Sequence, residues 1–192
     1  MTAIQAQSLP AILEGKDLLA QAKTGSGKTA AFAIGLLHQL EVTTYQVQSL
    51  ILCPTRELAD QVTNEIRRLA RSTPNTKIVT LCGGKSMDPQ LASLEHQPHI
   101  VVGTPGRILK HLDKGSLKLD GLKILVLDEA DRMLDMGFYD EIMRVIKIAP
   151  QKRQTLLFSA TYPHEIKKIS NTIQKNPVDV RDESVHDDKK IK

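Results

Sequence analysis

Residues 17–29 read DLLAQAKTGSGKT, and the order of residue types in this stretch indicates a strand, a tight turn and a helix. The run 17–21 has the length and apolar character of a buried strand. Gly25 and Gly27 then supply the backbone freedom that a tight turn needs, and a helical segment is expected after Gly27. A strand joined to a helix in this way is the repeating unit of a parallel sheet covered by helices.

The same alternation of short apolar runs with longer segments of helical period continues along the chain. It predicts an α/β fold, in which a mostly parallel sheet lies between two layers of helices. The expected strands are residues 17–21, 49–53, 77–81, 99–103, 123–127, 155–158 and 178–180. The expected helices are clearest after Gly27, Thr55, Pro105, Asp131 and Pro163.

Length and composition favour one domain followed by a short tail. A chain of 192 residues that is 41% hydrophobic can bury roughly two thirds of its unfolded surface, which suits a single core. Residues 1–181 are expected to form that domain. Residues 182–192, DESVHDDKKIK, are polar without an apolar period, so we interpret them as a linker or tail.

Charge and cysteine content exclude little by themselves. The net charge of +4 is a mild basic excess, which is compatible with a polyanionic partner but also common in metabolic enzymes. Cys53 and Cys82 end apolar runs, so buried thiols are expected rather than a disulfide or a metal site. Free thiols fit a reducing, cytoplasmic location. Export and membrane insertion are not expected, because no charged leader opens the chain and no run approaches the roughly 18 apolar residues of a membrane span.

The segment 22–29, AKTGSGKT, has the spacing of a phosphate-binding loop. Its glycines allow backbone N–H groups to face phosphate oxygens, and the following helix N-terminus adds partial positive charge. Lys28 would reach the β and γ phosphates, and Thr29 would be a ligand of Mg²⁺. The expected nucleotide-binding residues of this loop are Ala22, Thr24, Gly25, Ser26, Gly27, Lys28 and Thr29. Ala22 replaces the first glycine of the pattern, and an ordinary turn remains the alternative.

Two carboxylates follow the apolar run 124–127, at the end of a strand where ligands bind in open sheets. Asp128 is positioned to hold Mg²⁺, partly through water, and Glu129 to orient or deprotonate the water that attacks the γ-phosphate. With Lys28 they form the expected catalytic set. The alternative is an acidic pair that only stabilises the N-terminus of the next helix.

The chain also resembles the DEAD-box family of ATP-dependent RNA helicases, because residues 128–131 spell DEAD and are followed by RMLDMGF. The other matching segments, in chain order, are Gln5 in MTAIQ, AKTGSGKT, PTRELADQ at 54–61, Gly83–Gly84, TPGR at 104–107 and SAT at 159–161. The stretches LCPTRELADQV, TLCGG and DEADRMLDMGF resemble the DbpA-like bacterial members, which act on ribosomal RNA during ribosome assembly.

This resemblance implies a three-layer RecA-like P-loop NTPase domain that binds ATP, Mg²⁺ and RNA. Gln5 would recognise adenine through its amide, and Asp131, Ser159 and Thr161 would couple the ATP site to RNA. The RNA-binding positions that it implies are Pro54, Thr55, Arg56, Gly83, Gly84, Thr104, Pro105, Gly106 and Arg107. Taken singly, each of these turns is also explained as a plain strand-to-helix connection.

The resemblance further implies a partner lobe. The second RecA-like lobe of the family is absent from this sequence, so the isolated lobe is expected to be a nearly inactive monomer. With three tyrosines, three phenylalanines and no tryptophan, base stacking is not expected, and RNA would be held sequence-independently through its backbone. Two alternatives remain: another P-loop enzyme, such as a DNA translocase or nucleotide kinase, and a non-catalytic RNA clamp or scaffold.

Overall fold

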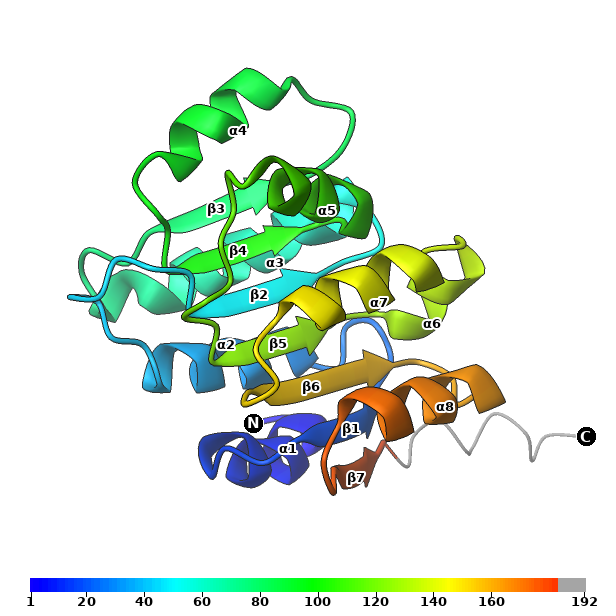
Figure 1. Cartoon of the computed structure of the whole chain (residues 1–192). Coiled ribbons are helices and arrows are strands. Elements are labelled where there is room, and N and C mark those ends of the chain that lie inside the picture. Colours follow the sequence, from blue (N-terminus) through cyan, green and yellow to red (C-terminus); the bar gives the residue numbers. More distant parts are fainter. Residues whose placement is uncertain (183–192) are drawn as a thin grey trace, which may run out of the picture.

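A single sheet organises the chain, which is known here from a computed structural model that describes residues 1–182. The remainder of the expected tail, residues 183–192, lies outside the described residues. All seven strands are parallel, in the order β3-β4-β2-β5-β6-β1-β7, and their arrows point the same way in Figure 1. The strands are β1 (Leu18–Gln21), β2 (Ser49–Leu52), β3 (Ile78–Leu81), β4 (Ile100–Gly103), β5 (Ile124–Leu127), β6 (Gln154–Ser159) and β7 (Val178–Arg181). The predicted α/β class is confirmed, and the sheet is wholly rather than mostly parallel.

Each predicted strand is present, with its bounds displaced by at most one residue. The helices are α1 (Ala3–Leu13), α2 (Lys28–His38), α3 (Arg56–Leu69), α4 (Met87–Leu94), α5 (Pro105–Lys114), α6 (Ala130–Asp135), α7 (Tyr139–Ile148) and α8 (His164–Ile173). A short 3₁₀ turn, Ala70–Ser72, follows α3. The expected start of the helix after Asp131 was wrong, because α6 begins at Ala130 and Asp131 lies in its first turn.

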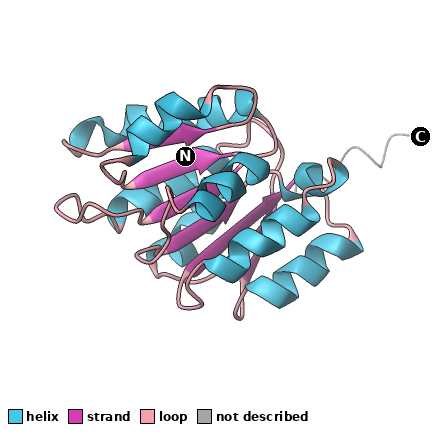
Figure 2. Ribbon diagram, turned by 45° about the horizontal axis from the view of Figure 1, so that its top comes forward, coloured by secondary structure: helices cyan, strands magenta, loops and turns pink. Residues whose placement is uncertain are grey.

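The sheet separates two apolar cores, and Figure 2 shows helices on both of its faces. Side chains of α1, α2 and α3 pack on one face with Leu18 and Ala20, while those of α5, α7 and α8 pack on the other with Leu19. Because successive residues of a strand point to opposite faces, burial on both sides requires apolar residues at every position. This is why the strands read as continuous apolar runs.

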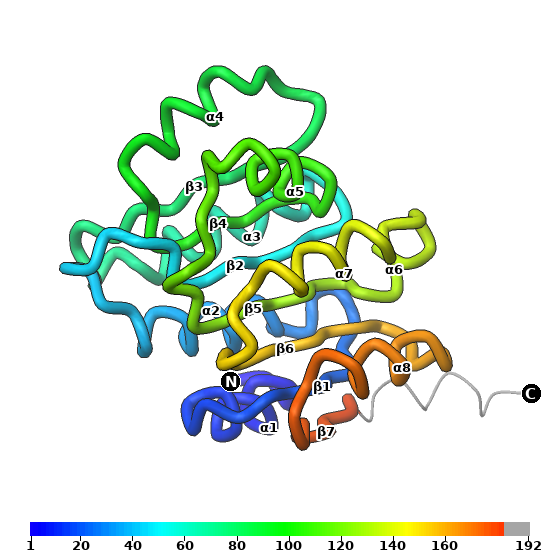
Figure 3. Tube along the Cα trace, in the orientation of Figure 1, coloured from blue at the N-terminus to red at the C-terminus, as the bar shows by residue number. Residues whose placement is uncertain are grey.

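The ends of the described chain meet at one side of the sheet. Helix α1 contacts β7, and the trace in Figure 3 shows both beside β1. Because every strand is parallel, the turns that leave the carboxyl ends of the strands all emerge at one edge of the sheet. None of the helices in residues 1–182 combines the length and apolar character that a membrane span requires.

Candidate functional site

The turn from β1 into α2 forms a phosphate-sized cradle. Gly27 is the N-cap of α2 and has φ 89°, a left-handed conformation that glycine adopts without strain. A Cβ at Gly27 would lie 2.6 Å from Gln5 Nε2 and 2.8 Å from Thr2 Oγ1, so a larger residue would displace both side chains. The sequence AKTGSGKT therefore takes the backbone form that exposes N–H groups at a helix N-terminus.

Lys28 and Asp128 meet at the centre of the site. The Lys28 Nζ lies 3.0 Å from Asp128 Oδ1, and the two residues are 4% and 0% exposed. Burial raises the pKa of the Asp128 carboxyl, and the Lys28 ammonium opposes that shift. The Ser26 hydroxyl, the Lys28 ammonium and both Asp128 oxygens are buried without a well-directed hydrogen bond among the described residues. Polar groups buried in this state indicate a site built for a polar ligand.

Glu129 is held beside this pair by an unusual backbone. It has φ 52°, a left-handed conformation that costs a residue with a side chain about 1–2 kcal/mol, and it is the N-cap of α6. Its Oε1 accepts a hydrogen bond from Thr24 Oγ1 at 3.0 Å and lies 3.9 Å from Lys28 Nζ. The strained turn thus directs the Glu129 carboxylate to the phosphate-binding loop.

A pocket of about 420 Å³ connects these groups to α3. The residues of α3 that line it, which the sequence analysis did not single out, are Leu58, Gln61, Val62, Glu65 and Arg68. Their spacing of three or four residues places them on one face of a helix, and this periodicity was the available signal. A nucleotide bound at the loop would therefore lie beside α3 as well.

The same groups suit Mg²⁺. This ion prefers oxygen ligands and is commonly held by one or two carboxylates together with substrate phosphates and water. Asp128 offers buried carboxylate oxygens beside the Lys28 ammonium, and Thr29 offers a hydroxyl in the first turn of α2. Within residues 1–182 no three acidic, histidine or cysteine side chains gather into a cluster that could hold a metal ion by itself.

Gln5 lies against the phosphate-binding loop. Its Nε2 donates to the Gly27 carbonyl at 3.1 Å, and its Oε1 accepts from the Thr2 N–H at 3.0 Å in a capping box of α1. A glutamine amide has two N–H groups and two acceptor lone pairs, so one of each remains for a ligand. The predicted adenine contact is compatible with this arrangement and stays a prediction.

The turns after β2, β3 and β4 lie side by side. The Gly83 N–H donates to Thr104 Oγ1 at 3.3 Å, and a Cβ at Gly84 would lie 3.8 Å from Arg56 Nη1. Arg56 forms no ion pair among the described residues, so the alternative of a salt bridge near Glu57 is not seen. The predicted RNA-binding positions at 54–56, 83–84 and 104–107 thus share one edge of the sheet.

Arg107 is only partly available to a ligand. Its Nη1 donates to the Lys85 carbonyl at 2.9 Å and to Gln90 Oε1 at 3.1 Å. The guanidinium is therefore anchored from one side by the protein.

Of the expected coupling residues, Thr161 is hydrogen-bonded to Asp131, whereas Ser159 is not. Asp131 Oδ2 accepts from Thr161 N at 3.1 Å and from Thr161 Oγ1 at 2.9 Å, which joins α6 to the segment after β6. Ser159 was expected to bond Asp131, but its hydroxyl donates to the Thr161 carbonyl at 2.7 Å, because β6 ends at Ser159 and the chain turns back there. No side chain caps α8, so neither hydroxyl acts as the helix cap that was the alternative.

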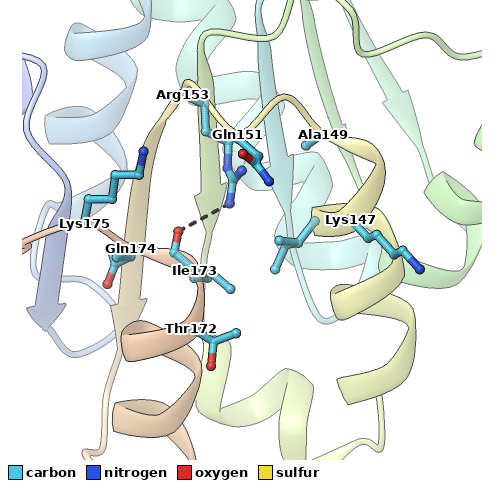
Figure 4. A pocket seen from close by; sticks show the side chains of 9 residues that line it. Lys147, Ala149, Gln151, Arg153, Thr172, Ile173, Gln174 and Lys175 are labelled. Atoms are coloured by element: carbon cyan, nitrogen blue, oxygen red, sulfur yellow. Dashed lines mark hydrogen bonds between the residues drawn. The ribbon is translucent and has the colours of Figure 1, made fainter.

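A second pocket, of about 430 Å³, lies at the opposite edge of the sheet, between the C-terminal ends of α7 and α8 (Figure 4). Arg153 donates there to the Pro150 carbonyl at 2.8 Å and to the Ile173 carbonyl at 3.3 Å. Helix C-termini carry partial negative charge, so a cation that caps them is stabilising. We interpret Arg153 as a structural residue.

The fold, together with the residues at the carboxyl ends of β1 and β5, defines a class of protein. A parallel sheet with a glycine-rich loop and lysine after β1, and two carboxylates after β5, is an α/β nucleotide-binding domain of the P-loop, RecA-like type. The family model described as DEAD/DEAH box helicase matches residues 2–169, and the chain belongs to that family. The resemblance noted in the sequence is confirmed.

Individual relatives agree with this assignment. The chain is 61% identical over 184 residues to ATP-dependent RNA helicase DbpA of Escherichia coli strain K12, with 96% of the chain and 40% of that protein covered. It is 48% identical to ATP-dependent RNA helicase CshA of Listeria monocytogenes, with 94% of the chain and 34% of that protein covered. A solved DEAD box protein from the hyperthermophile Methanococcus jannaschii superimposes with a TM-score of 0.89 at 41% identity, covering 94% of the chain and 49% of that structure. The chain thus spans less than half the length of these relatives.

Proposed function

We propose that this chain is the ATP-binding lobe of an ATP-dependent RNA helicase, an RNA-stimulated ATPase that separates short RNA duplexes. The observation that carries the proposal is the meeting of Lys28, Asp128 and Glu129 at the sheet edge that also bears the three clustered turns, with Lys28 and Glu129 lining the pocket there. The two relatives described above are both ATP-dependent RNA helicases, which supports the same function.

The residues of the site divide the chemistry among them. The backbone N–H groups of the loop and the Lys28 ammonium would bind the β and γ phosphates, and Gln5 would recognise adenine. Mg²⁺, held by Asp128 and Thr29 and partly through water, would neutralise the charge that develops on the phosphates. Glu129 would orient the attacking water and accept its proton, because its carboxylate is held 3.9 Å from Lys28 Nζ by the left-handed turn.

The comparison of RNA with DNA tests the substrate class. ATP hydrolysis by the complete protein is measured alone, with RNA, and with DNA of the same sequence and length. We expect strong stimulation by RNA and little by DNA, because contacts to the 2′-hydroxyl distinguish the two backbones. Equal stimulation by DNA would contradict an RNA helicase and favour a DNA translocase, and no stimulation by either would favour a nucleotide kinase or scaffold.

The Glu129→Gln variant tests the catalytic role. The amide keeps the size of the side chain and can still accept from Thr24, but it cannot take a proton from water. We expect hydrolysis to fall by about 10²–10⁴-fold while ATP binding remains. Glu95→Gln, at an exposed position after α4, is the matched control. Normal turnover in Glu129→Gln would refute the assigned role.

Finer assignments are part of the proposal. We infer that ribosomal RNA is the target, in ribosome assembly, on the strength of the resemblance to DbpA-like sequences. We also infer that a second RecA-like lobe completes the ATP site, since the relatives are more than twice as long as the matched region. We further propose that the protein is monomeric and cytoplasmic. Crosslinking of the tagged protein to RNA in growing cells tests the target, and enrichment of RNAs other than ribosomal RNA would contradict it.

A further inference from the structure

Gln90, in α4, lies outside every motif that the sequence analysis singled out, yet both the nitrogen and the oxygen of its amide form hydrogen bonds. The residue is 7% exposed. Its Nε2 donates to the Cys82 carbonyl at 3.0 Å, just after β3. Its Oε1 accepts from Arg107 Nη1 at 3.1 Å and from His111 Nε2 at 2.8 Å, both in α5. One buried side chain therefore joins three elements of the fold.

Hydrogen-bond accounting allows only one orientation of this amide. A flipped amide would place its NH₂ group against the Arg107 guanidinium, which has donors only, and its oxygen against the Cys82 carbonyl. With the amide so oriented, His111 must donate from Nε2, and its Nδ1 lies 2.9 Å from the Ser116 hydroxyl, which also lies 3.1 Å from the His111 carbonyl as a donor. Burial and the nearby charges of Arg107 and Lys114 lower the pKa of His111, which favours this neutral ring.

The network fixes the loop 82–85 at three points. Gln90 holds the Cys82 carbonyl, Arg107 holds the Lys85 carbonyl at 2.9 Å, and Thr104 accepts from the Gly83 N–H at 3.3 Å. Gly84, with φ 77°, is the one residue of this loop whose backbone forms no hydrogen bond to these side chains. The turn after β3 and the N-terminus of α5 are thereby made into one unit.

The same network leaves one side of the Arg107 guanidinium available to a phosphate. A guanidinium has five N–H groups, and the two on Arg107 Nη1 are directed to Lys85 and Gln90. The three on Nε and Nη2 have no hydrogen-bond partner among the residues that the structure describes. Planar N–H groups in this arrangement suit bidentate binding of a phosphate.

We propose that Gln90 is a positioning residue for RNA binding, which holds Arg107 and the turn 82–85 in the geometry that grips consecutive phosphates. This inference rests on the proposed function, because it names the device that orders two of the predicted phosphate contacts. Gln90 itself does not touch RNA. It lowers the cost of binding by ordering the loop and the arginine beforehand.

The informative variant is Gln90→Glu in the complete protein. The carboxylate keeps the acceptors for Arg107 and His111 but loses the donor to the Cys82 carbonyl, and it neutralises the Arg107 charge. We expect the RNA concentration for half-maximal ATPase stimulation to rise by roughly tenfold, while kcat at saturating RNA changes little. The slope of log affinity against log salt should fall by about one, as for the loss of one phosphate contact.

Gln97→Ala is the matched control. Gln97 also donates its amide to two carbonyls, those of Leu94 and Ser116, but it contacts neither Arg107 nor the turn 82–85. It should lose some thermal stability and keep the RNA half-saturation and the salt slope of the wild type. Gln90→Ala should weaken RNA binding and also lower the melting temperature, because it leaves buried groups of Cys82 and His111 without partners.

Unchanged RNA half-saturation and salt slope in Gln90→Glu would overturn the proposal. Equal losses in Gln90→Glu and Gln97→Ala would also overturn it, because they would show a general effect of destabilisation. Failure of the proposed function would be recognised separately, since the wild-type ATPase would then show either no stimulation by RNA or equal stimulation by DNA.

Discussion

Replacing Lys28 by methionine should make the stability of the domain depend strongly on pH. Lys28 is the largest influence that lowers the pKa of Asp128, whereas burial and Glu129 both raise it. Methionine fills the space of the lysine stem but leaves the Asp128 carboxyl buried at 0% exposure without a cation. Removing one partner of a buried pair typically costs about 3–5 kcal/mol.

Protonation of Asp128 limits this loss. Starting from the ordinary carboxyl pKa of 3.8, proton uptake costs about 4 kcal/mol at pH 7 and about 2 kcal/mol at pH 5. The folded variant holds the proton to higher pH than the unfolded chain does, so its stability falls as pH rises. The stability lost relative to wild type should therefore be small near pH 5 and grow towards pH 7 by up to about 1.4 kcal/mol per pH unit.

Urea unfolding of residues 1–192 at pH 5, 6 and 7, without nucleotide, measures this difference directly. Lys118→Met, at an exposed position, is the control and should show no such trend. The variant should also fail to bind ATP with Mg²⁺ at pH 7, because it lacks the phosphate-binding ammonium. A loss of equal size at pH 5 and pH 7 would refute the assumption that Lys28 and Asp128 form a functional buried pair.

Three shorter predictions follow from other contacts. Gly27→Ala should abolish ATP binding in equilibrium titrations and lower the melting temperature, since its Cβ meets Gln5 at 2.6 Å; Gly106→Ala, with open space around it, should fold normally. Thr161→Val removes the 2.9 Å bond to Asp131 and should reduce duplex separation by the complete protein more than its ATP hydrolysis, and equal losses would argue against coupling. Burial raises the pKa of Cys82 to about 11, so iodoacetamide at pH 8 should label it only in urea, and rapid labelling of the native chain would contradict its burial.

Much of the fold was predictable because its signals are local. Burial on both faces requires apolar residues at every strand position, so each strand appears in the sequence as a continuous run. The start of α2 was predictable for a similar reason, because Gly27 and the residues beside it form the turn that precedes the helix. The start of α6 was misplaced, since the left-handed Glu129 allows the helix to begin at Ala130, two residues earlier than predicted.

The candidate site was predictable in its members and less so in its contacts. Lys28 and Asp128 were recognised from separate segments, and the parallel sheet places both segments at one edge. The bond from Gln5 to Gly27 and the change of partner at Ser159 depend on how the chain turns after α1 and β6. No local pattern specifies such turns, because they follow from packing against distant residues.

The sequence alone determined the strands, the phosphate-binding loop and the paired carboxylates, since each is written in neighbouring residues. Only the tertiary structure decided which of these groups touch, how the Lys28 and Asp128 charges are buried, and that Gln90 joins Cys82 to Arg107 and His111. The physical reason is separation: Gln90 is 8, 17 and 21 residues from these partners, and chain geometry brings them together where sequence periodicity does not reach.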